Sequence, residues 1–153
     1  MDTSAFLHHL TAQPSYSGQI AHVEHIPPRD ANCVELDKPL VSSLQDCLNE
    51  HGLLPLYVHQ AEAINYARQG KNVMVATSSA SGKTLCYNIP VLEALLTERF
   101  SRALYLFPTK ALAQGQLRGL LELFCPSLFK VEELATFDGD TPQAERPEIR
   151  KRA

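Results

Sequence analysis

The chain has 153 residues, of which 44% are hydrophobic and 20% are charged, a balance that predicts a globular, soluble domain with its own core. The net charge of −3 argues against a uniformly basic nucleic-acid binder, so any nucleic-acid site must be local. The N-terminus has no basic segment and no long apolar stretch follows it, which predicts neither a secretory signal nor a membrane span. We expect a cytoplasmic protein in a bacterium, or a nuclear one in a eukaryote.

The cysteines and histidines show no spacing typical of a metal site. The four cysteines are far apart and form no C-x-x-C pair, which predicts free, mostly buried thiols in a reducing compartment. The six histidines include the tandem His8-His9 but no metal-binding motif. The sequence therefore predicts no structural metal. The cysteines are Cys33, Cys47, Cys86 and Cys125.

The first 38 residues predict an extended N-terminal arm. Their apolar residues are scattered, and the adjacent prolines Pro27 and Pro28 exclude regular helix or central strand around them. From residue 39 onward the pattern changes to that of a folded domain. Apolar residues at helical spacing predict helices at about 40–51 and 58–69, each followed by a glycine stop signal.

Three short apolar runs predict strands at 72–76, 103–107 and 134–137. Helical patterns separate them, one from Gly82 onward and one from Leu112 to Pro126. Strands that alternate with helices predict an α/β fold of three layers, with a parallel sheet between helices on both faces. The continuous apolar run at 103–107 fits a strand that is covered on both faces.

Three further local features follow from proline and turn residues. Pro90 lies inside a helical pattern, which predicts a kink or a break there. The run Asp138-Gly139-Asp140 predicts a turn. Thr141 and Pro142 then suit the N-cap and first position of a last helix.

A loop of small residues joins the first predicted strand to the next helix. It reads Thr77-Ser78-Ser79-Ala80-Ser81 and ends in Gly82-Lys83-Thr84. Small side chains let backbone N–H groups turn toward an anion, and a lysine at this point can reach the outer phosphates of a nucleotide. The strict pattern G-x-x-x-x-G-K-[ST] is missed at one place, because Thr77 stands at its first glycine. From this motif alone, an ordinary strand-to-helix loop remains the alternative.

Four stretches in order resemble the first RecA-like domain of superfamily 2 helicases of the DEAD/DEAH-box type. The similarity is greatest to the branch of ATP-dependent DNA helicases that includes the bacterial mitomycin-repair helicase and its fungal RecQ-like relatives. It extends from about residue 20 to the end of the chain. The stretches are LYVHQ at 56–60, TSSASGKT at 77–84, LFPTKAL at 106–112 and FDGDTP at 137–142.

The resemblance implies an ATP site with Mg²⁺ as cofactor. Gln60 would bind the adenine edge, since its amide both donates and accepts, whereas its alternative is an exposed residue at a helix start. Tyr57 would pack near the base or serve as a core tyrosine. Lys83 would stabilise charge on the transferred phosphoryl group and Thr84 would bind Mg²⁺, which makes these two the catalytic candidates. The residues assigned to the nucleotide are Tyr57, Gln60, Thr77, Ser78, Ser79, Ala80, Ser81, Gly82, Lys83, Thr84 and Leu85.

The resemblance also implies a nucleic-acid contact, with DNA favoured over RNA. Backbone N–H groups and the Thr109 hydroxyl at the start of a helix can hold a phosphate without much net basic charge. The alternatives are a simple helix cap there and a plain turn at Gly139. A basic cluster at 146–152 reads as a solvated helix face. The residues assigned to nucleic acid are Pro108, Thr109, Lys110, Gly139, Asp140 and Thr141.

The chain lacks the acidic Mg²⁺ motif of such helicases and the second RecA-like domain that supplies the arginine finger. We therefore expect the N-terminal portion of a DNA helicase, in the DNA-repair branch named above, that alone hydrolyses little ATP. Two other functions stay open: a small P-loop kinase and a non-enzymatic nucleotide-binding scaffold.

Overall fold

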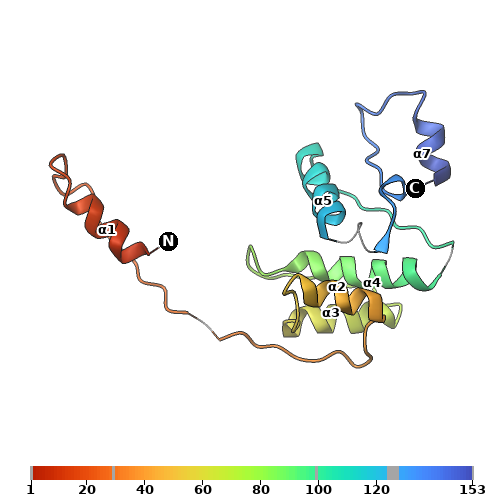
Figure 1. The fold of residues 1–153 in the computed structure, drawn as a ribbon, viewed down its shortest axis with the longest axis horizontal. Coiled ribbons are helices and arrows are strands. Elements are labelled where there is room, and N and C mark those ends of the chain that lie inside the picture. The colour runs from red at the N-terminus through yellow and green to blue at the C-terminus, as the bar shows by residue number, and fades with distance from the viewer. Residues whose placement is uncertain (1, 29, 99, 124–127, 153) are drawn as a thin grey trace. The chain divides into compact units, whose positions relative to one another are not determined.

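The computed structural model describes residues 2–28, 30–98, 100–123 and 128–152, and the chain divides into two compact units, Met1–Asp30 and Ala31–Ala153 (Figure 1). The first unit contains helix α1 (Thr3–Thr11), so the expectation of an arm extended throughout is wrong. Asp2 begins this helix, because its Oδ1 accepts the N–H groups of Ser4 at 2.9 Å and Ala5 at 3.1 Å. The sequence signal was a capping aspartate ahead of apolar residues, well before the two prolines.

The second unit begins before the predicted boundary at residue 39. Cys33 and Tyr57 form an isolated antiparallel bridge, and the N–H of Val34 donates to the carbonyl oxygen of Leu56 at 3.0 Å. The segment after Asp30 is therefore bound to the body of the domain through its backbone.

Helices α2 (Ser42–Glu50), α3 (Val58–Arg68) and α4 (Lys83–Thr97) confirm the helices predicted in these regions. Helix α3 packs against α4, and apolar side chains of α2 complete the core. The buried core residues are Leu44, Cys47, Leu48, Leu56, Ile64, Leu85, Ile89, Leu92 and Leu120. This core holds the first turn of α3 beside the start of α4, where the candidate nucleotide site lies.

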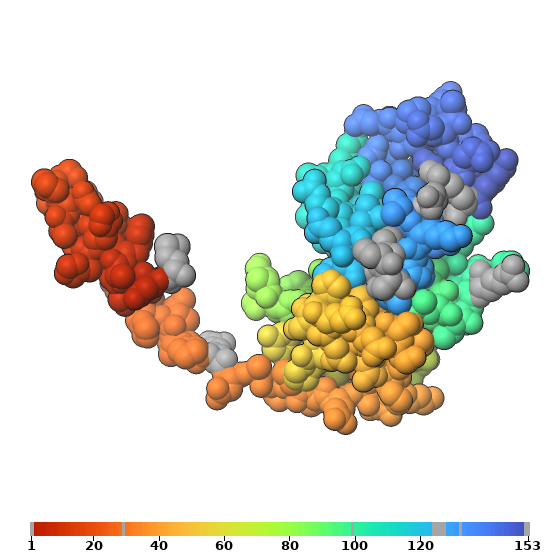
Figure 2. Space-filling view, in the orientation of Figure 1, coloured from red at the N-terminus to blue at the C-terminus, as the bar shows by residue number. Residues whose placement is uncertain are grey.

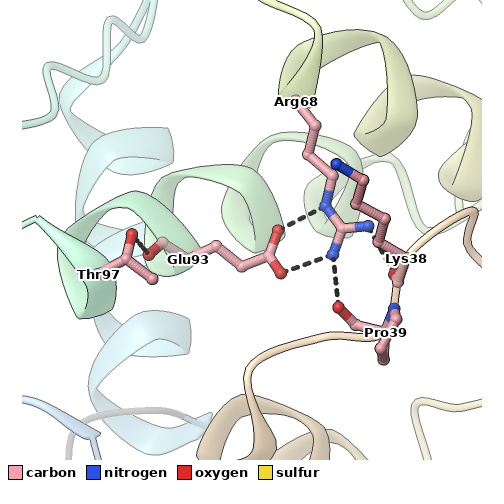
Figure 3. A network of polar contacts seen from close by, with 5 residues as sticks. All are labelled: Lys38, Pro39, Arg68, Glu93 and Thr97. Carbon is pink, nitrogen blue, oxygen red and sulfur yellow. Dashed lines mark hydrogen bonds and ion pairs between the residues drawn. The ribbon is translucent and has the colours of Figure 1, made fainter.

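A mostly buried ion pair connects α3 to α4. The guanidinium of Arg68 binds both carboxylate oxygens of Glu93, at 2.9 Å and 2.6 Å, and the two side chains are only 19% and 14% exposed. The same guanidinium donates to the carbonyl oxygens of Lys38 at 2.7 Å and Pro39 at 3.3 Å (Figure 3). One side chain thus holds two helices and the segment that leads into α2.

The sequence predicted a kink or a break at Pro90. Helix α4 continues through this residue, so a break is wrong. A proline removes one N–H from the helical ladder and crowds the carbonyl four residues earlier. The neighbouring side chains of Ile89 and Leu92 are 0% and 4% exposed, so packing on both sides of the proline keeps the helix in place. Tertiary burial here outweighs the local preference.

The C-terminal half contains α5 (Lys110–Leu123), the short 3-10 helix η1 (Val131–Glu133) and α7 (Arg146–Arg152). The predicted end of α5 near Pro126 lies outside the described residues, as does Cys125. The predicted turn at 138–140 is present. However, α7 begins four residues after Pro142, because the Thr141 hydroxyl does not cap a helix. It accepts the N–H of Asp138 at 2.9 Å and closes the turn.

The predicted parallel sheet is not formed among the described residues. Segments 72–76, 103–107 and 134–137 do not pair with one another, and the Cys33–Tyr57 bridge is the only strand-type pairing that this part of the chain contains. A strand is stabilised by hydrogen bonds to a neighbouring strand, and none of these three segments has such a neighbour here.

The expectation that 103–107 is covered on both faces is also wrong. Leu104 and Leu106 are 84% and 83% exposed, whereas Tyr105 and Phe107 on the other face are half-buried. A hollow of about 1180 Å³ lies beside this segment and is lined also by α5 and residues 133–138. The strand-like alternation is present, but only one face has packing partners.

Three further observations concern the thiols, possible metal-binding groups and possible membrane spans. Cys33, Cys47 and Cys86 are free thiols, and the last two are buried as predicted. Within the described ranges, no group of three or more His, Cys, Asp or Glu side chains could hold a metal ion. None of the described helices has the length and apolar character of a membrane span.

Candidate nucleotide and nucleic-acid sites

The loop predicted to bind phosphate begins at residue 77 and leads directly into α4. Gly82 is the N-cap of α4 with φ 76° and ψ 24°, a left-handed conformation that glycine adopts without a steric penalty. Ala80 also has a positive φ, 56°, which is uncommon for a residue with a side chain. The loop is thus tightly wound, and four of its small residues, 77–80, are exposed to solvent.

The ammonium of Lys83 lies within this loop. Its Nζ donates to the carbonyl oxygens of Ser78 and Thr77, the latter at 3.1 Å, and lies 3.4 Å from the hydroxyl of Ser81. The small residues therefore wrap around a positive charge. A polyanion that bound here would replace these carbonyl oxygens at the ammonium.

Gln60 links the first turn of α3 to the N-terminus of α4. Its Oε1 accepts the N–H of Tyr57 at 2.9 Å, and its Nε2 donates to the carbonyl oxygen of Gly82 at 2.9 Å. The side chain is 2% exposed, so the alternative of an exposed residue at a helix start is wrong. Both polar atoms of the amide are engaged within the protein.

His59 is a site residue that the sequence analysis missed. Its Nε2 donates to the carbonyl oxygen of Ser81 at 2.9 Å, and its ring stacks on Tyr57 with 5.9 Å between centroids. The signal was its position, directly before Gln60 in the first turn of a helix. Tyr57 itself is 42% exposed, which excludes the alternative of a core tyrosine.

Two successive side chains of α3 thus hold two successive carbonyl groups of the loop. His59 holds that of Ser81 and Gln60 holds that of Gly82. A trans peptide group directs its N–H opposite to its carbonyl, so the N–H groups of Gly82 and Lys83 point away from α3. The hydrogen bonds of the described residues include none donated by either group. Unpaired N–H groups at a helix start are the donors that an anion site uses.

Cys86 follows Lys83 by one turn and takes no part in this chemistry. Burial raises the pKa of its thiol from the ordinary value, and hydrogen bonding and the charge of Lys83 offset this only in part. The group is therefore a neutral core residue rather than a reactive thiolate.

The two segments predicted to contact nucleic acid lie together. Lys110 Nζ is 2.5 Å from Asp140 Oδ2, and a Cβ added at Gly139 would lie 3.9 Å from the same nitrogen. Thr109 caps α5, because its hydroxyl accepts the N–H of Leu112 at 3.3 Å. Asp140 holds the pKa of Lys110 above its usual value, chiefly through this hydrogen bond. Pro108, Thr109 and Lys110 are all exposed to solvent.

Arg146 fixes the turn that carries Asp140, and the sequence analysis had assigned it only to a solvated helix face. Its guanidinium donates to the carbonyl oxygens of Thr141 at 3.0 Å and Asp138 at 3.2 Å. It also lies over the ring of Phe137, 5.3 Å from the centroid, and Arg150 lies 5.5 Å from that centroid. The light-blue residues of α5 and the dark-blue residues of α7 share one surface of the second unit (Figure 2).

Comparison with known protein families assigns the chain to one of them. The family model described as DEAD/DEAH box helicase matches residues 57–153, well over half of the sequence. This chain belongs to the DEAD/DEAH-box helicase family. The family named by the sequence resemblance is therefore confirmed, and the match includes the loop around Lys83 and both segments that meet at Lys110.

Individual helicases of this family are similar over most of the chain. The uncharacterized ATP-dependent helicase YprA of Bacillus subtilis is 39% identical over 86% of this chain, which spans 18% of that protein. The ATP-dependent helicase hrq1 of Schizosaccharomyces pombe is 38% identical over 94% of the chain, and 14% of that protein is covered. The chain thus spans less than a fifth of these relatives.

A solved helicase structure has a fold similar to that of this chain. The crystal structure of the DUF1998 helicase MrfA bound to DNA and AMPPNP matches 83% of this chain and 18% of that chain, with 40% identity and a TM-score of 0.76. The folded part of this DEAD/DEAH-box chain therefore resembles part of a helicase for which a complex with DNA and a nucleotide analogue is known.

Proposed function

We propose that this chain is the ATP-binding N-terminal portion of an ATP-dependent helicase that couples ATP hydrolysis to translocation on nucleic acid or to its unwinding. The observation that carries this proposal is the pair of hydrogen bonds from His59 and Gln60 to the two carbonyl groups next to Lys83. These hydrogen bonds would orient the small-residue loop and Lys83 toward an anion. The names of the relatives, all ATP-dependent helicases, support the same activity.

Lys83 is the proposed centre of the ATP site. Its ammonium would exchange the carbonyl oxygens of Thr77 and Ser78 for phosphate oxygens, and the N–H groups of Gly82 and Lys83 would donate to the same phosphates. Loop residues 77–81 would line this region, as proposed from the sequence, whereas the side chain of Leu85 lies in the apolar core. A carbonyl-bound ammonium is an exchangeable partner, because a phosphate offers it opposite charge as well as hydrogen bonds.

Thr84 is proposed to hold Mg²⁺ at the start of α4. The donor set fits, since a hydroxyl next to a phosphate-binding lysine is an oxygen ligand of the kind that Mg²⁺ accepts. The ion would supply neutralisation of charge on the phosphates during transfer. Thr84 would offer its hydroxyl oxygen as a ligand of the ion, directly after Lys83 in the chain.

The adenine would lie near Tyr57 and Gln60. Tyr57 is exposed and already stacks on His59, so a planar face is available to a base. Gln60 would bind the adenine edge with the second N–H of its Nε2 and the second lone pair of its Oε1, and would keep its bonds to Gly82 and Tyr57. Binding of the base would then be coupled to the phosphate loop through a single side chain.

The nucleic-acid contact is proposed for 108–110 and 139–141. The N-cap of α5 presents backbone N–H groups beside Lys110, and the glycine at 139 allows close approach of a phosphate. The MrfA structure bound to DNA supports DNA as the partner. A role in DNA repair, and a cytoplasmic or nuclear location, are proposals that follow from the branch of the family.

Residues 31–153, rather than 39–153 as expected from the sequence, are proposed to be the first part of a RecA-like domain with a parallel sheet, and 1–30 a separate N-terminal segment. The likeness to MrfA supports this, while the unpaired segments at 72–76 and 103–107 have the apolar composition of inner strands. Efficient hydrolysis would require an acidic Mg²⁺ motif and a second RecA-like domain in the whole protein.

The deciding experiment is an ATPase assay of the full-length protein with and without single-stranded DNA. We expect stimulation by DNA and, for Lys83→Ala, a loss on the order of 100-fold or more in turnover. Phosphorylation of a metabolite without any effect of DNA would instead indicate a small kinase. A Lys83→Ala protein that retains full function in cells would indicate a scaffold.

A further inference from the structure

The bond between Lys110 and Asp140 occupies the amino group that the proposed nucleic-acid site depends on. Nζ lies 2.5 Å from Asp140 Oδ2, and the two side chains are 53% and 81% exposed. An ion pair this exposed contributes little to stability, because water and salt screen it. The pair can therefore open without cost to the fold.

The carboxylate is held in place by its own turn. The N–H of Asp140 donates to Asp138 Oδ1 at 2.8 Å, and the N–H of Asp138 donates to the Thr141 hydroxyl at 2.9 Å. Arg146 binds the carbonyl oxygens on both sides of this turn. The backbone that carries Asp140 is thus fixed beside Lys110, and Asp140 stays near even when the pair opens.

A phosphate that binds Lys110 must share the ammonium with this carboxylate or displace it, and in both cases it lies close to the carboxylate. Both ligands are anions that pair with the same single positive charge, so they compete for its attraction. The displaced Asp140 would remain within a few ångströms of the phosphate and repel it. The local charge of the pair is close to zero, although a lysine is present.

We propose that Asp140 is a built-in competitor of the nucleic-acid phosphate at Lys110, and that it keeps binding at this site weak and readily reversible. This inference rests on the proposed nucleic-acid function of the same site. Weak binding suits a protein that must release and rebind its strand in each cycle. Asp140, first assigned as a direct contact, thereby becomes a residue that sets affinity.

The test compares Asp140→Asn with wild-type protein, using a fluorescein-labelled single-stranded oligothymidylate and anisotropy over a series of salt concentrations. Asparagine retains the shape and the backbone turn but removes the charge. We expect binding to tighten roughly 3- to 10-fold at low salt, since one like charge beside a phosphate is removed. The slope of log affinity against log salt should change by less than about 0.7, the value for one further phosphate contact to a single strand, because the phosphate contacts Lys110 in both proteins.

Two further variants separate the possible outcomes. Glu62→Gln removes one negative charge from an exposed position on α3 and should leave affinity and slope unchanged, which controls for net charge. Lys110→Ala should weaken binding. If Lys110→Ala weakens binding but Asp140→Asn is equal to or weaker than wild type, the competitor role is wrong while the nucleic-acid site stands. If Lys110→Ala has no effect, or wild type and Asp140→Asn both fail to bind, the proposed site itself is wrong.

Discussion

Gln60 Nε2 lies 2.9 Å from the carbonyl oxygen of Gly82, and a Cβ at position 82 would lie only 2.5 Å from the same nitrogen. Position 82 therefore requires glycine both for its positive φ and for the close approach of this amide. The first turn of α3 and the candidate phosphate loop are in direct contact. A substitution in one should therefore alter the position of the other.

Gln60→Ala should weaken nucleotide binding. The substitution leaves the Gly82 carbonyl and the Tyr57 N–H without their partner, which costs about 1–3 kcal/mol. We expect the dissociation constant for ATP, measured by calorimetry, to rise about 5- to 150-fold. The matched control is Gln69→Ala, at an exposed position at the end of α3, which should leave affinity unchanged. An unaltered affinity of Gln60→Ala would show that the contact to Gly82 does not position the loop.

His59→Ala should raise KM for ATP more than it lowers kcat, because His59 acts on the loop through Ser81 and does not touch the reacting atoms. Loss of one hydrogen bond of this kind costs about 1 kcal/mol, which is roughly a 5-fold change. His59→Gln keeps a donor on a longer side chain and should recover part of the affinity. Steady-state ATPase assays of the full-length protein give both constants, and equal loss in His59→Gln and His59→Ala would contradict the role of the donor.

Arg68→Ala should destabilise the fold without a specific effect on ligand binding. It removes a bidentate partner of the mostly buried Glu93 and leaves that carboxylate unpaired, which costs about 3 kcal/mol. Chemical denaturation followed by circular dichroism measures the loss. Arg118→Ala, at an exposed position on α5, should change the free energy of unfolding by less than about 0.5 kcal/mol. Similar small effects for both variants would mean that the ion pair does not hold α3 to α4.

Tyr105→Phe should reduce the loss of stability at high pH. Burial of Tyr105, followed by the charge of Tyr87, raises the pKa of its hydroxyl to about 12, and the hydroxyl has no hydrogen-bond partner among the described residues. The unfolded chain then releases this proton from about pH 10, while the folded chain holds it to about pH 12, so the stability contributed below pH 10 is lost across that window.

Denaturation curves at pH 8 and pH 11 test this directly. The difference between the two pH values should be smaller in Tyr105→Phe than in wild type, and the variant should be no less stable at pH 8, since an unsatisfied buried hydroxyl is removed. The exposed Tyr66→Phe is the matched control and should keep the wild-type difference. A wild-type difference in Tyr105→Phe would show that this hydroxyl titrates normally.

The sequence predicted well what depends on neighbouring residues. Helical spacing indicated α2, α3 and the start of α4 at Gly82, because a helix satisfies its hydrogen bonds within one segment. Strands depend on partners elsewhere in the chain, and residues 103–107 have strand composition but no paired neighbour among the described residues.

The missed site residues were those whose roles arise only in three dimensions. His59 and Arg146 act by donating to carbonyl groups of other segments. Every residue has a backbone carbonyl group, so the sequence does not indicate which one accepts the hydrogen bond. Thr141 was placed as a helix cap because its type suits one, whereas its hydroxyl closes the turn before it. The motif around Lys83 was recognisable because its chemistry and its local geometry come from the same few residues.

The outward face of residues 103–107 has a practical consequence. Leu104 and Leu106 lie on a segment of strand-like composition whose backbone is not part of a ladder within the described chain. Such an edge offers both apolar contacts and free backbone groups to a second copy, and this combination favours aggregation. A preparation of these 153 residues alone should therefore become turbid as its concentration rises, and charged substitutions at positions 104 and 106 should keep it clear.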